Sequence, residues 1–122
     1  MTSQPSILVV DDELLIRDLL YDFFSSQGWS IAVAENGVKA LEVMKNRPVD
    51  VVLTDIKMPE MDGLELTTEL KKSHPDTPVV LMTGFPSVDT AVSALRSRVV
   101  DYVIKPFNIN QLFKLVEATV KR

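Results

Sequence analysis

The sequence predicts an alternating α/β domain built on a parallel, five-stranded sheet. Short apolar runs rich in β-branched residues alternate with longer segments of helical period. Most of the runs are continuously apolar, which is typical of strands that helices cover on both faces. Five strand-and-helix units within 122 residues leave only short connections. Right-handed crossovers between the strands then make the sheet parallel.

The predicted strands are the five short apolar runs. In chain order they are Ile7–Val10, Ser30–Ala34, Val51–Thr54, Val79–Met82 and Tyr102–Ile104.

Each predicted helix carries an apolar stripe, and each has a start or stop signal. The stripes are Ile16, Leu19, Leu20, Phe23 and Phe24 in the first helix, Val38, Leu41 and Met44 in the second (Gly37–Asn46), Leu66 and Leu70 in the third (from Gly63), Val88, Ala91, Val92 and Leu95 in the fourth, and Leu112, Leu115 and Val116 in the fifth. Gly28 suits the left-handed position after the first helix, and Pro48 and Pro75 end the second and third. Ser87 and Asn108 are expected to cap the fourth and fifth.

Composition narrows the class of protein. With 46% hydrophobic and 25% charged residues, the chain has the balance of one soluble domain, which we expect to span residues 1–122. The absence of Cys excludes disulfides and thiolate chemistry. A net charge of −4 argues against direct nucleic-acid binding. No apolar run reaches the length of a membrane span, and the N-terminus lacks the positive charge of a signal peptide, so we expect a cytoplasmic protein.

Polar and charged residues follow the carboxyl ends of four predicted strands, where ligands bind in open parallel sheets. They are Asp11, Asp12 and Glu13, then Asp55, then Thr83 and Gly84, then Lys105 and Pro106. Two carboxylates 4 Å apart repel by about 4 kcal/mol at an effective dielectric constant of 20, so a counter-charge is needed. Mg²⁺ binds through one or two carboxylates together with waters and phosphate oxygens. The pattern therefore predicts phosphate chemistry at a metal site.

Four motifs carry a resemblance that covers nearly the whole chain. They are ILVVDDE (7–13), TDIKMPEMDG (54–63), TGFPSVDTAVSAL (83–95) and DYVIKPF (101–107). In this order the motifs resemble those of response-regulator receiver domains of two-component signalling. The resemblance implies a flavodoxin-like fold with strand order 2-1-3-4-5, five helices on both faces and the second strand at an edge.

The resemblance also implies roles for the strand-end residues. Asp55 is the implied phospho-acceptor, whose carboxylate attacks phosphorus to form an aspartyl phosphate. Asp12 and Asp55, with the backbone carbonyl of Lys57, would ligate Mg²⁺, and Asp11 would act through a bound water.

The remaining implied roles concern the phosphoryl oxygens and the response to phosphorylation. Lys105 would pair with one phosphoryl oxygen, and the Thr83 hydroxyl would bind another. Gly84 leaves room for the phosphoryl group. Tyr102 would be the switch aromatic, which moves inward as Thr83 moves toward the phosphate. Such a domain catalyses its own modification and turns over no metabolite.

Partners follow from the same resemblance. The phosphoryl donor would be a histidine kinase, a phosphotransfer protein or a small acyl phosphate. The receiver either stands alone or is part of a longer regulator or hybrid kinase, with an output domain beyond residue 122 as one form and a phosphorylation-dependent homodimer as another. Neither nucleic acid nor membrane is an expected direct partner. The stretch 83–95 resembles receivers attached to transcriptional activators.

Each residue also has an ordinary structural interpretation. Asp11 and Asp12 would only favour the start of the first helix, and Asp55 would only begin a turn. Lys105 would be a surface lysine, Thr83 a turn hydroxyl and Tyr102 a core aromatic. These interpretations do not explain why all of these residues share one sheet edge. His74, the only histidine, is expected to be a solvated loop residue.

Two departures from the family pattern are visible. Arg98 and Val99 stand where the family usually has Gly and then Ala, so we expect the loop there to run differently. Phe85 and Pro86 form a bulky, stiff entrance beside Thr83, which would slow hydrolysis of the phosphoryl group.

Three other classes fit the sequence less well. A haloacid-dehalogenase-like phosphatase carries a D-x-D pattern after the first strand, and Asp11-Asp12-Glu13 does not match this pattern. A flavodoxin-like electron carrier needs a hydroxyl- and Gly-rich first loop, and three acids would repel the flavin phosphate. The fingerprints of P-loop and Rossmann nucleotide binders are absent. We expect neither flavin absorbance nor turnover of a phosphomonoester.

Overall fold

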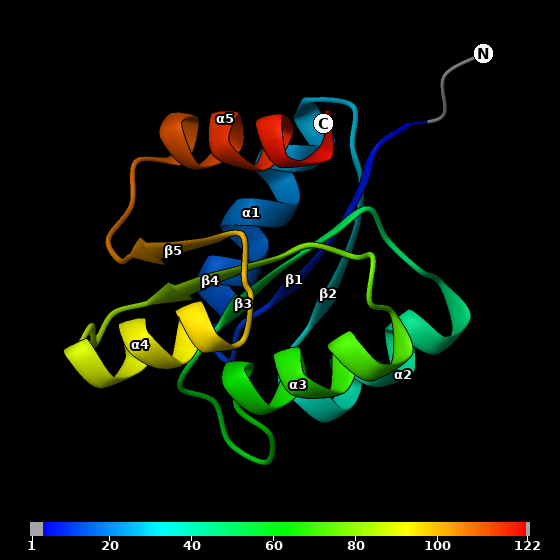
Figure 1. The fold of residues 1–122 in the computed structure, drawn as a ribbon. Coiled ribbons are helices and arrows are strands. Elements are labelled where there is room, and N and C mark those ends of the chain that lie inside the picture. Colours follow the sequence, from blue (N-terminus) through cyan, green and yellow to red (C-terminus); the bar gives the residue numbers. More distant parts are fainter. Residues whose placement is uncertain (1–3, 122) are drawn as a thin grey trace.

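A computed structural model describes residues 4–121, in which five strands and five helices alternate along the chain (Figure 1). The strands are β1 (Ser6–Val10), β2 (Ser30–Ala34), β3 (Val51–Asp55), β4 (Val79–Thr83) and β5 (Asp101–Ile104). The helices are α1 (Leu14–Ser26), α2 (Gly37–Asn46), α3 (Gly63–Ser73), α4 (Val88–Arg96) and α5 (Ile109–Val120). Every predicted element is present. Strands β1 and β5 begin one residue earlier than predicted, at Ser6 and Asp101, and β3 and β4 end one residue later, at Asp55 and Thr83.

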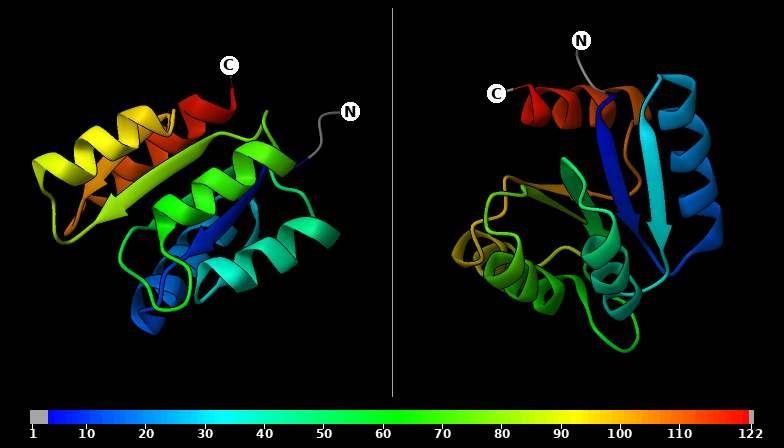
Figure 2. Two further views of the ribbon diagram at one scale, coloured as in Figure 1. Left: turned by 60° about the horizontal axis from the view of Figure 1, so that its bottom comes forward. Right: turned by 90° about the vertical axis from the view of Figure 1, so that its right-hand side faces the viewer.

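The strands form one parallel sheet in the order β2-β1-β3-β4-β5, which confirms the expected topology. The central strands β1, β3 and β4 are almost wholly buried, because helices cover both faces of the sheet (Figure 2). The outer strands β2 and β5 are only partly buried. The continuously apolar runs therefore mark the interior of the sheet, as expected for parallel strands.

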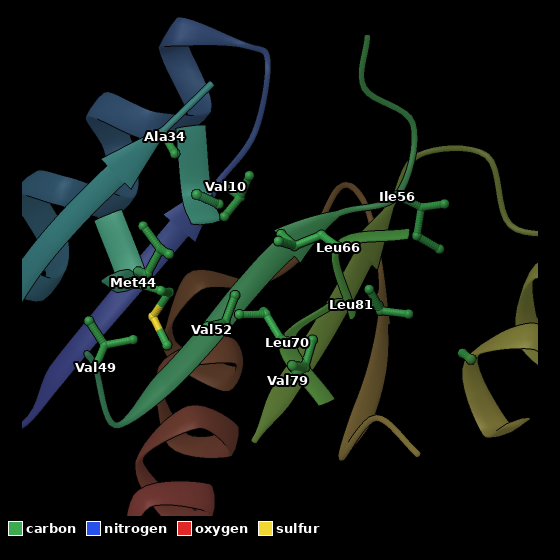
Figure 3. Packing of buried hydrophobic residues seen from close by; sticks show 13 residues of the cluster. Val10, Ala34, Met44, Val49, Val52, Ile56, Leu66, Leu70, Val79 and Leu81 are labelled. Atoms are coloured by element: carbon green, nitrogen blue, oxygen red, sulfur yellow. The ribbon is translucent and has the colours of Figure 1, made fainter. Parts of the chain in front are cut away.

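Two layers of core lie on opposite faces of the sheet. Helices α1 and α5 pack on one face through Leu20, Phe24, Leu112 and Val116. Helices α2, α3 and α4 lie on the other face, where Met44 of α2 and Leu66 and Leu70 of α3 meet side chains from β1, β3 and β4 (Figure 3). Alternate residues of each central strand face the two layers, which fixes the sheet register.

The ends of the helices follow the predicted signals. Gly28 has a φ of 84° and follows α1 in the left-handed conformation. The side chains of Ser87 and Asn108 accept hydrogen bonds from the N–H groups of Thr90 and Gln111 at the starts of α4 and α5. Two further caps were not predicted. They are Asn36 before α2 and the capping box of Asp62 and Glu65 before α3.

Helix α4 corrects one prediction. The stripe predicted to face the core points to solvent, since Val88 is 78% exposed, Leu95 is 79% exposed and Val92 is 38% exposed. Ala94, one residue outside that stripe, is the buried residue of the helix. The small side chain of Ala94 lets α4 approach the sheet closely. Hydrophobic periodicity shows that a helix has an apolar face, but it does not show whether that face packs on the core or points to solvent. Leu19 of α1 and Val38 of α2, also assigned to core stripes, are likewise exposed.

The loop after α4 corrects a second prediction. Arg98 adopts the left-handed conformation itself, with a φ of 61°. The N–H groups of Arg98 and Val99 donate to the carbonyls of Leu95 and Ala94, at 3.2 and 3.4 Å. This is the hydrogen-bond pattern of a Schellman motif, which usually has glycine at the position of Arg98. The helix end is therefore kept at the expense of backbone strain.

Replacing Arg98 with glycine is expected to stabilise the protein. Relief of the left-handed strain, less the greater freedom of glycine in the unfolded chain, gives about 0.5–1 kcal/mol. Thermal unfolding followed by circular dichroism should show a melting temperature higher by a few degrees. Arg98→Ala is the control, because it removes the long side chain and keeps the strain. A melting temperature raised equally by Arg98→Ala would mean that the side chain, and not the backbone, is unfavourable.

Candidate functional site

The carboxyl ends of β1, β3 and β5 bring together residues that are far apart in the sequence. Asp11 follows β1, Asp55 is the last residue of β3, and Lys105 follows β5. The Lys105 ammonium lies 2.7 Å from Asp11 Oδ2 and 3.2 Å from Asp55 Oδ2. The prediction that these residues meet at one sheet edge is confirmed.

Lys105 is bound by a third carboxylate as well. Its Nζ lies 3.3 Å from Glu13 Oε1, and its side chain is only 11% exposed. A largely buried ammonium interacts strongly with its three carboxylate partners, because water screens these interactions only in part. Lys105 is therefore not the ordinary surface lysine of the alternative interpretation.

Backbone N–H groups orient the two buried carboxylates. Asp55 Oδ1 accepts a hydrogen bond from the N–H of Ile56 at 2.9 Å, which leaves Oδ2 for Lys105. Asp11 Oδ1 accepts from the N–H of Glu13 at 2.9 Å. Helix α1 begins after Glu13 without a side-chain cap, so Asp11 and Asp12 are not its N-caps.

Three acids are placed so that they can share a metal ion. Asp11, Asp12 and Asp55 each offer one carboxylate oxygen, and these oxygens all lie within 4.8 Å of one another. Oxygen ligands in a small cluster of negative charge are the donor set that hard divalent cations prefer. Asp12 is exposed and the other two are buried, so the cluster opens to solvent on one side. Lys57 lies in the loop after β3 with an exposed side chain, and the role of its carbonyl stays a prediction.

Burial shifts the protonation equilibria of the site. Burial, together with the nearby charge of Asp11, raises the pKa of Asp55 from 3.8 to about 6, although Lys105 opposes this shift. Burial also raises the pKa of Asp11. Burial lowers the pKa of Lys105, but its hydrogen bonds and ion pairs with Asp11 and Asp55 outweigh burial and raise it. The two carboxylates are therefore short of positive charge even with Lys105 present.

Thr83 and Tyr102 lie on neighbouring strands. Thr83 is the buried last residue of β4, and its Oγ1 accepts a hydrogen bond from the N–H of Phe85 at 3.0 Å. Tyr102 pairs with Leu81 across β4 and β5, and its hydroxyl lies 2.7 Å from Thr90 Oγ1. A Cβ on Gly84 would lie 3.9 Å from Lys105 Cβ, so the backbone there borders open space beside Lys105. Thr83 ends its strand as expected, whereas Tyr102 lies two residues before the end of β5, and the roles of both stay predictions.

Sequence reasoning missed the structural part that Gly63 plays in the site. A Cβ at Gly63 would lie 2.1 Å from the carbonyl oxygen of Asp55, so only glycine lets the start of α3 approach the end of β3 this closely. Sequence reasoning also missed Arg17, whose guanidinium donates to the Asp11 carbonyl at 2.7 Å. No spacing rule connects these residues to the site. His74 ends α3 half-buried, with its Nδ1 2.9 Å from Ser73 Oγ, rather than in open solvent as expected.

Comparison with known proteins agrees with the geometry. A family model described as the response regulator receiver domain matches residues 7–117. The regulatory protein AtoC of Escherichia coli K12 is 44% identical over 121 residues, which are 99% of this chain and 26% of that protein. The DNA-binding transcriptional regulator NtrC of the same organism is 40% identical over 114 residues, which are 93% of this chain and 24% of that protein. The chain thus spans about a quarter of the length of these curated relatives.

Solved structures show the same fold. A CheY-like receiver domain protein from Methanospirillum hungatei JF-1 is 28% identical and superposes with a TM-score of 0.94, covering 98% of this chain and 95% of that chain. NtrX from Brucella abortus is 37% identical with a TM-score of 0.90, covering 98% of this chain and 27% of that chain. Within residues 4–121 of the present chain, no helix is long and apolar enough to cross a membrane.

Asp55→Asn is expected to stabilise the metal-free protein in a pH-dependent way. When the pKa of a carboxyl group rises on folding, the protein loses stability as the pH increases from the pKa of the unfolded state, near 3.8, to that of the folded state, about 6. The amide escapes this loss, and Lys105 keeps Asp11 and Glu13 as partners. The stabilisation should be small at pH 4, grow between pH 4 and pH 6, and level off above pH 6 at no more than about 3 kcal/mol. Urea unfolding in the presence of a chelator measures it.

The same substitution at an exposed aspartate provides the control. Asp76→Asn removes a carboxylate from an exposed turn and should show no comparable change between pH 4 and pH 7. A destabilised Asp55→Asn protein at pH 7 would contradict the conclusion that the buried carboxylates lack positive charge.

Proposed function

Because the chain belongs to the response-regulator receiver domain family, we propose that it accepts a phosphoryl group on Asp55 and signals by changing its surface. The observation that carries this proposal is the buried Asp55 carboxylate, 5% exposed, beside a Lys105 ammonium and two further acids. Receiver domains are signalling domains. The chain would therefore modify itself without turning over a metabolite.

The transfer step forms one bond to phosphorus and breaks another. A carboxylate oxygen of Asp55 attacks phosphorus while the bond from phosphorus to the donor breaks. With a phosphohistidine donor, the P–N bond breaks and its electron pair stays on the imidazole, which takes up a proton. With an acyl phosphate, the P–O bond breaks and a carboxylate leaves. Lys105 would then pair with a phosphoryl oxygen, and the Ile56 N–H would keep the acceptor carboxylate oriented.

The acidic cluster supports a magnesium requirement. The ion would be held by Asp11, Asp12, Asp55 and the Lys57 carbonyl. Mg²⁺ would neutralise negative charge on the phosphoryl group during its transfer. The raised pKa of Asp55 supports the need for a further positive charge, because Lys105 alone does not bring the pKa back to its ordinary value.

The rim of the site supports a protein as the physiological donor. Leu14 and Leu15 begin α1 directly after the acidic loop and are 59% and 81% exposed. Phe85, two residues after Thr83, is 74% exposed. Large exposed apolar side chains around a polar site mark a surface that another protein covers. A histidine kinase or phosphotransfer protein would supply that surface.

The output would reside in a protein segment or partner that senses the phosphorylated surface. Two relatives about four times as long as this chain, one named a regulatory protein and the other a DNA-binding transcriptional regulator, support an output domain in the same polypeptide. A phosphorylation-dependent homodimer would deliver the same signal in trans. The acidic chain itself is a poor nucleic-acid ligand, so any contact with DNA would come from such an output domain.

Acetyl phosphate with Mg²⁺ should add one phosphoryl group to the protein, measured by intact-mass spectrometry. Asp55→Asn should abolish the addition, because an amide oxygen is not a comparable nucleophile. A chelator should reduce the addition strongly, since the charge of the phosphoryl group is then opposed by Lys105 alone. Asp76→Asn, which changes an exposed acid next to Pro75, is the matched control and should be modified normally. Undiminished addition to the Asp55→Asn protein would place the acceptor elsewhere.

Thr83→Ala is expected to separate phosphorylation from the surface change. The hydroxyl that would bind the phosphoryl group is lost, whereas Asp55 and Lys105 remain. Beryllofluoride, which stands in for the phosphoryl group on Asp55, should perturb backbone NMR shifts through residues 87–98 and 101–103 of the unmutated protein. In Thr83→Ala the changes should shrink to residues near Asp55. Perturbations confined to Asp55 in the unmutated protein would argue against a switch.

A further inference from the structure

Tyr102 is tied to helix α4 by a short hydrogen bond. Its hydroxyl lies 2.7 Å from Thr90 Oγ1, and the pair is partly buried. Tyr102 lies on edge strand β5, and Thr90 lies in the first turn of α4. The bond therefore joins the first turn of α4 to the edge strand β5.

The same Thr90 hydroxyl closes the N-terminus of α4. The N–H of Ser87 donates to Thr90 Oγ1 at 3.1 Å, and the N–H of Thr90 donates to Ser87 Oγ at 3.1 Å. Thr90 Oγ1 is also 3.1 Å from the Ser87 carbonyl, to which it can donate. Ser87 and Thr90 thus form a reciprocal cap in which threonine replaces the usual Glu or Gln.

A hydroxyl has one proton and two lone pairs, so these contacts constrain one another. The Ser87 N–H and the Tyr102 O–H can both donate to Thr90 Oγ1, and the single Thr90 proton then goes either to the Ser87 carbonyl or to Ser87 Oγ, which lies 3.0 Å away. In that arrangement the cap of α4 and the position of the Tyr102 ring share one oxygen atom. Displacing either partner removes a hydrogen bond from the other side.

The other end of the loop is held by Thr83. The N–H of Phe85 donates to Thr83 Oγ1 at 3.0 Å. Pro86 has a fixed φ and restricts the conformation of Phe85 before it, so the two residues between Gly84 and the Ser87 cap form a stiff segment. A shift of the Thr83 hydroxyl toward Asp55 would either carry the Phe85 N–H along or leave it without its acceptor. In the first case the stiff loop carries the displacement to Ser87.

We infer that Thr90 is the positioning residue that transmits the movement of Thr83 to Tyr102. The route runs through hydrogen bonds from Thr83 to Phe85, along the stiff loop to Ser87, and from Ser87 through Thr90 to the Tyr102 hydroxyl. Tyr102 therefore responds to a change of the α4 cap rather than only to space left by Thr83. This inference rests on the proposed phosphorylation of Asp55.

The test compares variants that remove one hydroxyl each. Thr90→Val keeps the shape of the side chain, and Tyr102→Phe keeps the ring. We expect both proteins to gain one phosphoryl group from acetyl phosphate, as measured by intact mass. In Thr90→Val, the shift changes that beryllofluoride causes at residues 101–103 should fall at least twofold, while those at residues 55–57 are kept. The double variant should respond like either single variant, because both remove the same bond.

Tyr102→Phe separates transmission from helix capping, because it leaves the hydrogen bonds between Ser87 and Thr90 in place. Two further variants test the Thr90 hydroxyl itself. Thr90→Ser retains the hydroxyl and should restore the response at residues 101–103. Thr68→Val makes the same substitution at an exposed position of α3 where the hydroxyl bonds only its own helix, to Leu64 at 3.1 Å, and should leave the response unchanged. A purely structural role of Thr90 would lower the melting temperature without this loss of response.

The outcomes are distinguishable. If neither the variants nor the unmutated protein gain a phosphoryl group, the proposed function is wrong and the inference falls with it. If phosphorylation proceeds and Thr90→Val transmits the shift changes to residues 101–103 as the unmutated protein does, the proposed function stands and the inference is wrong. The inference is equally wrong if the phosphorylated, unmutated protein shows no response at those residues.

Discussion

The ion pairs of Lys105 are the interaction on which the site depends. A single ammonium from the end of β5 joins carboxylates that follow β1 and end β3, 94 and 50 residues away in the sequence. Without it, two buried carboxylates would face each other with no charge to oppose them, which is costly in a medium of low dielectric constant. The same pairing leaves the site poised for change, because any group that alters the charge at Asp55 also alters how Lys105 is shared.

The fold supplies the geometry that this pairing requires. Parallel strands place all of their carboxyl ends at one edge, and the order β2-β1-β3-β4-β5 puts the end of β3 between those of β1 and β4. Gly63 allows α3 to start against the Asp55 carbonyl. The surrounding core is continuous on both faces of the sheet, so the acids are held on strands and strand ends that do not give way easily.

The sequence predicted which residues meet at the edge of the sheet, because residues that follow parallel strands lie at one edge. Apolar β-branched runs such as Val51–Thr54 mark the ends of these strands clearly. The sequence predicted the side chains of α4 poorly. The pattern of Val88, Val92 and Leu95 has helical period, but the small Ala94 is the residue that fits against the sheet. Nor could it predict the left-handed Arg98 or the bond between Thr90 and Tyr102. These features depend on how closely two elements approach, which no local pattern encodes.

Helix α4 differs from the other helices in what holds it. Its large apolar side chains face solvent, and its C-terminus carries the strain of Arg98. Its position is therefore set to an unusual degree by hydrogen bonds at its first turn, through Ser87 and Thr90. An element with little buried apolar surface opens or shifts at lower free energy than a packed helix. For this reason the proposed displacement of the Thr83 hydroxyl would move α4 more easily than α1 and α5, which are packed through Phe24 and Val116.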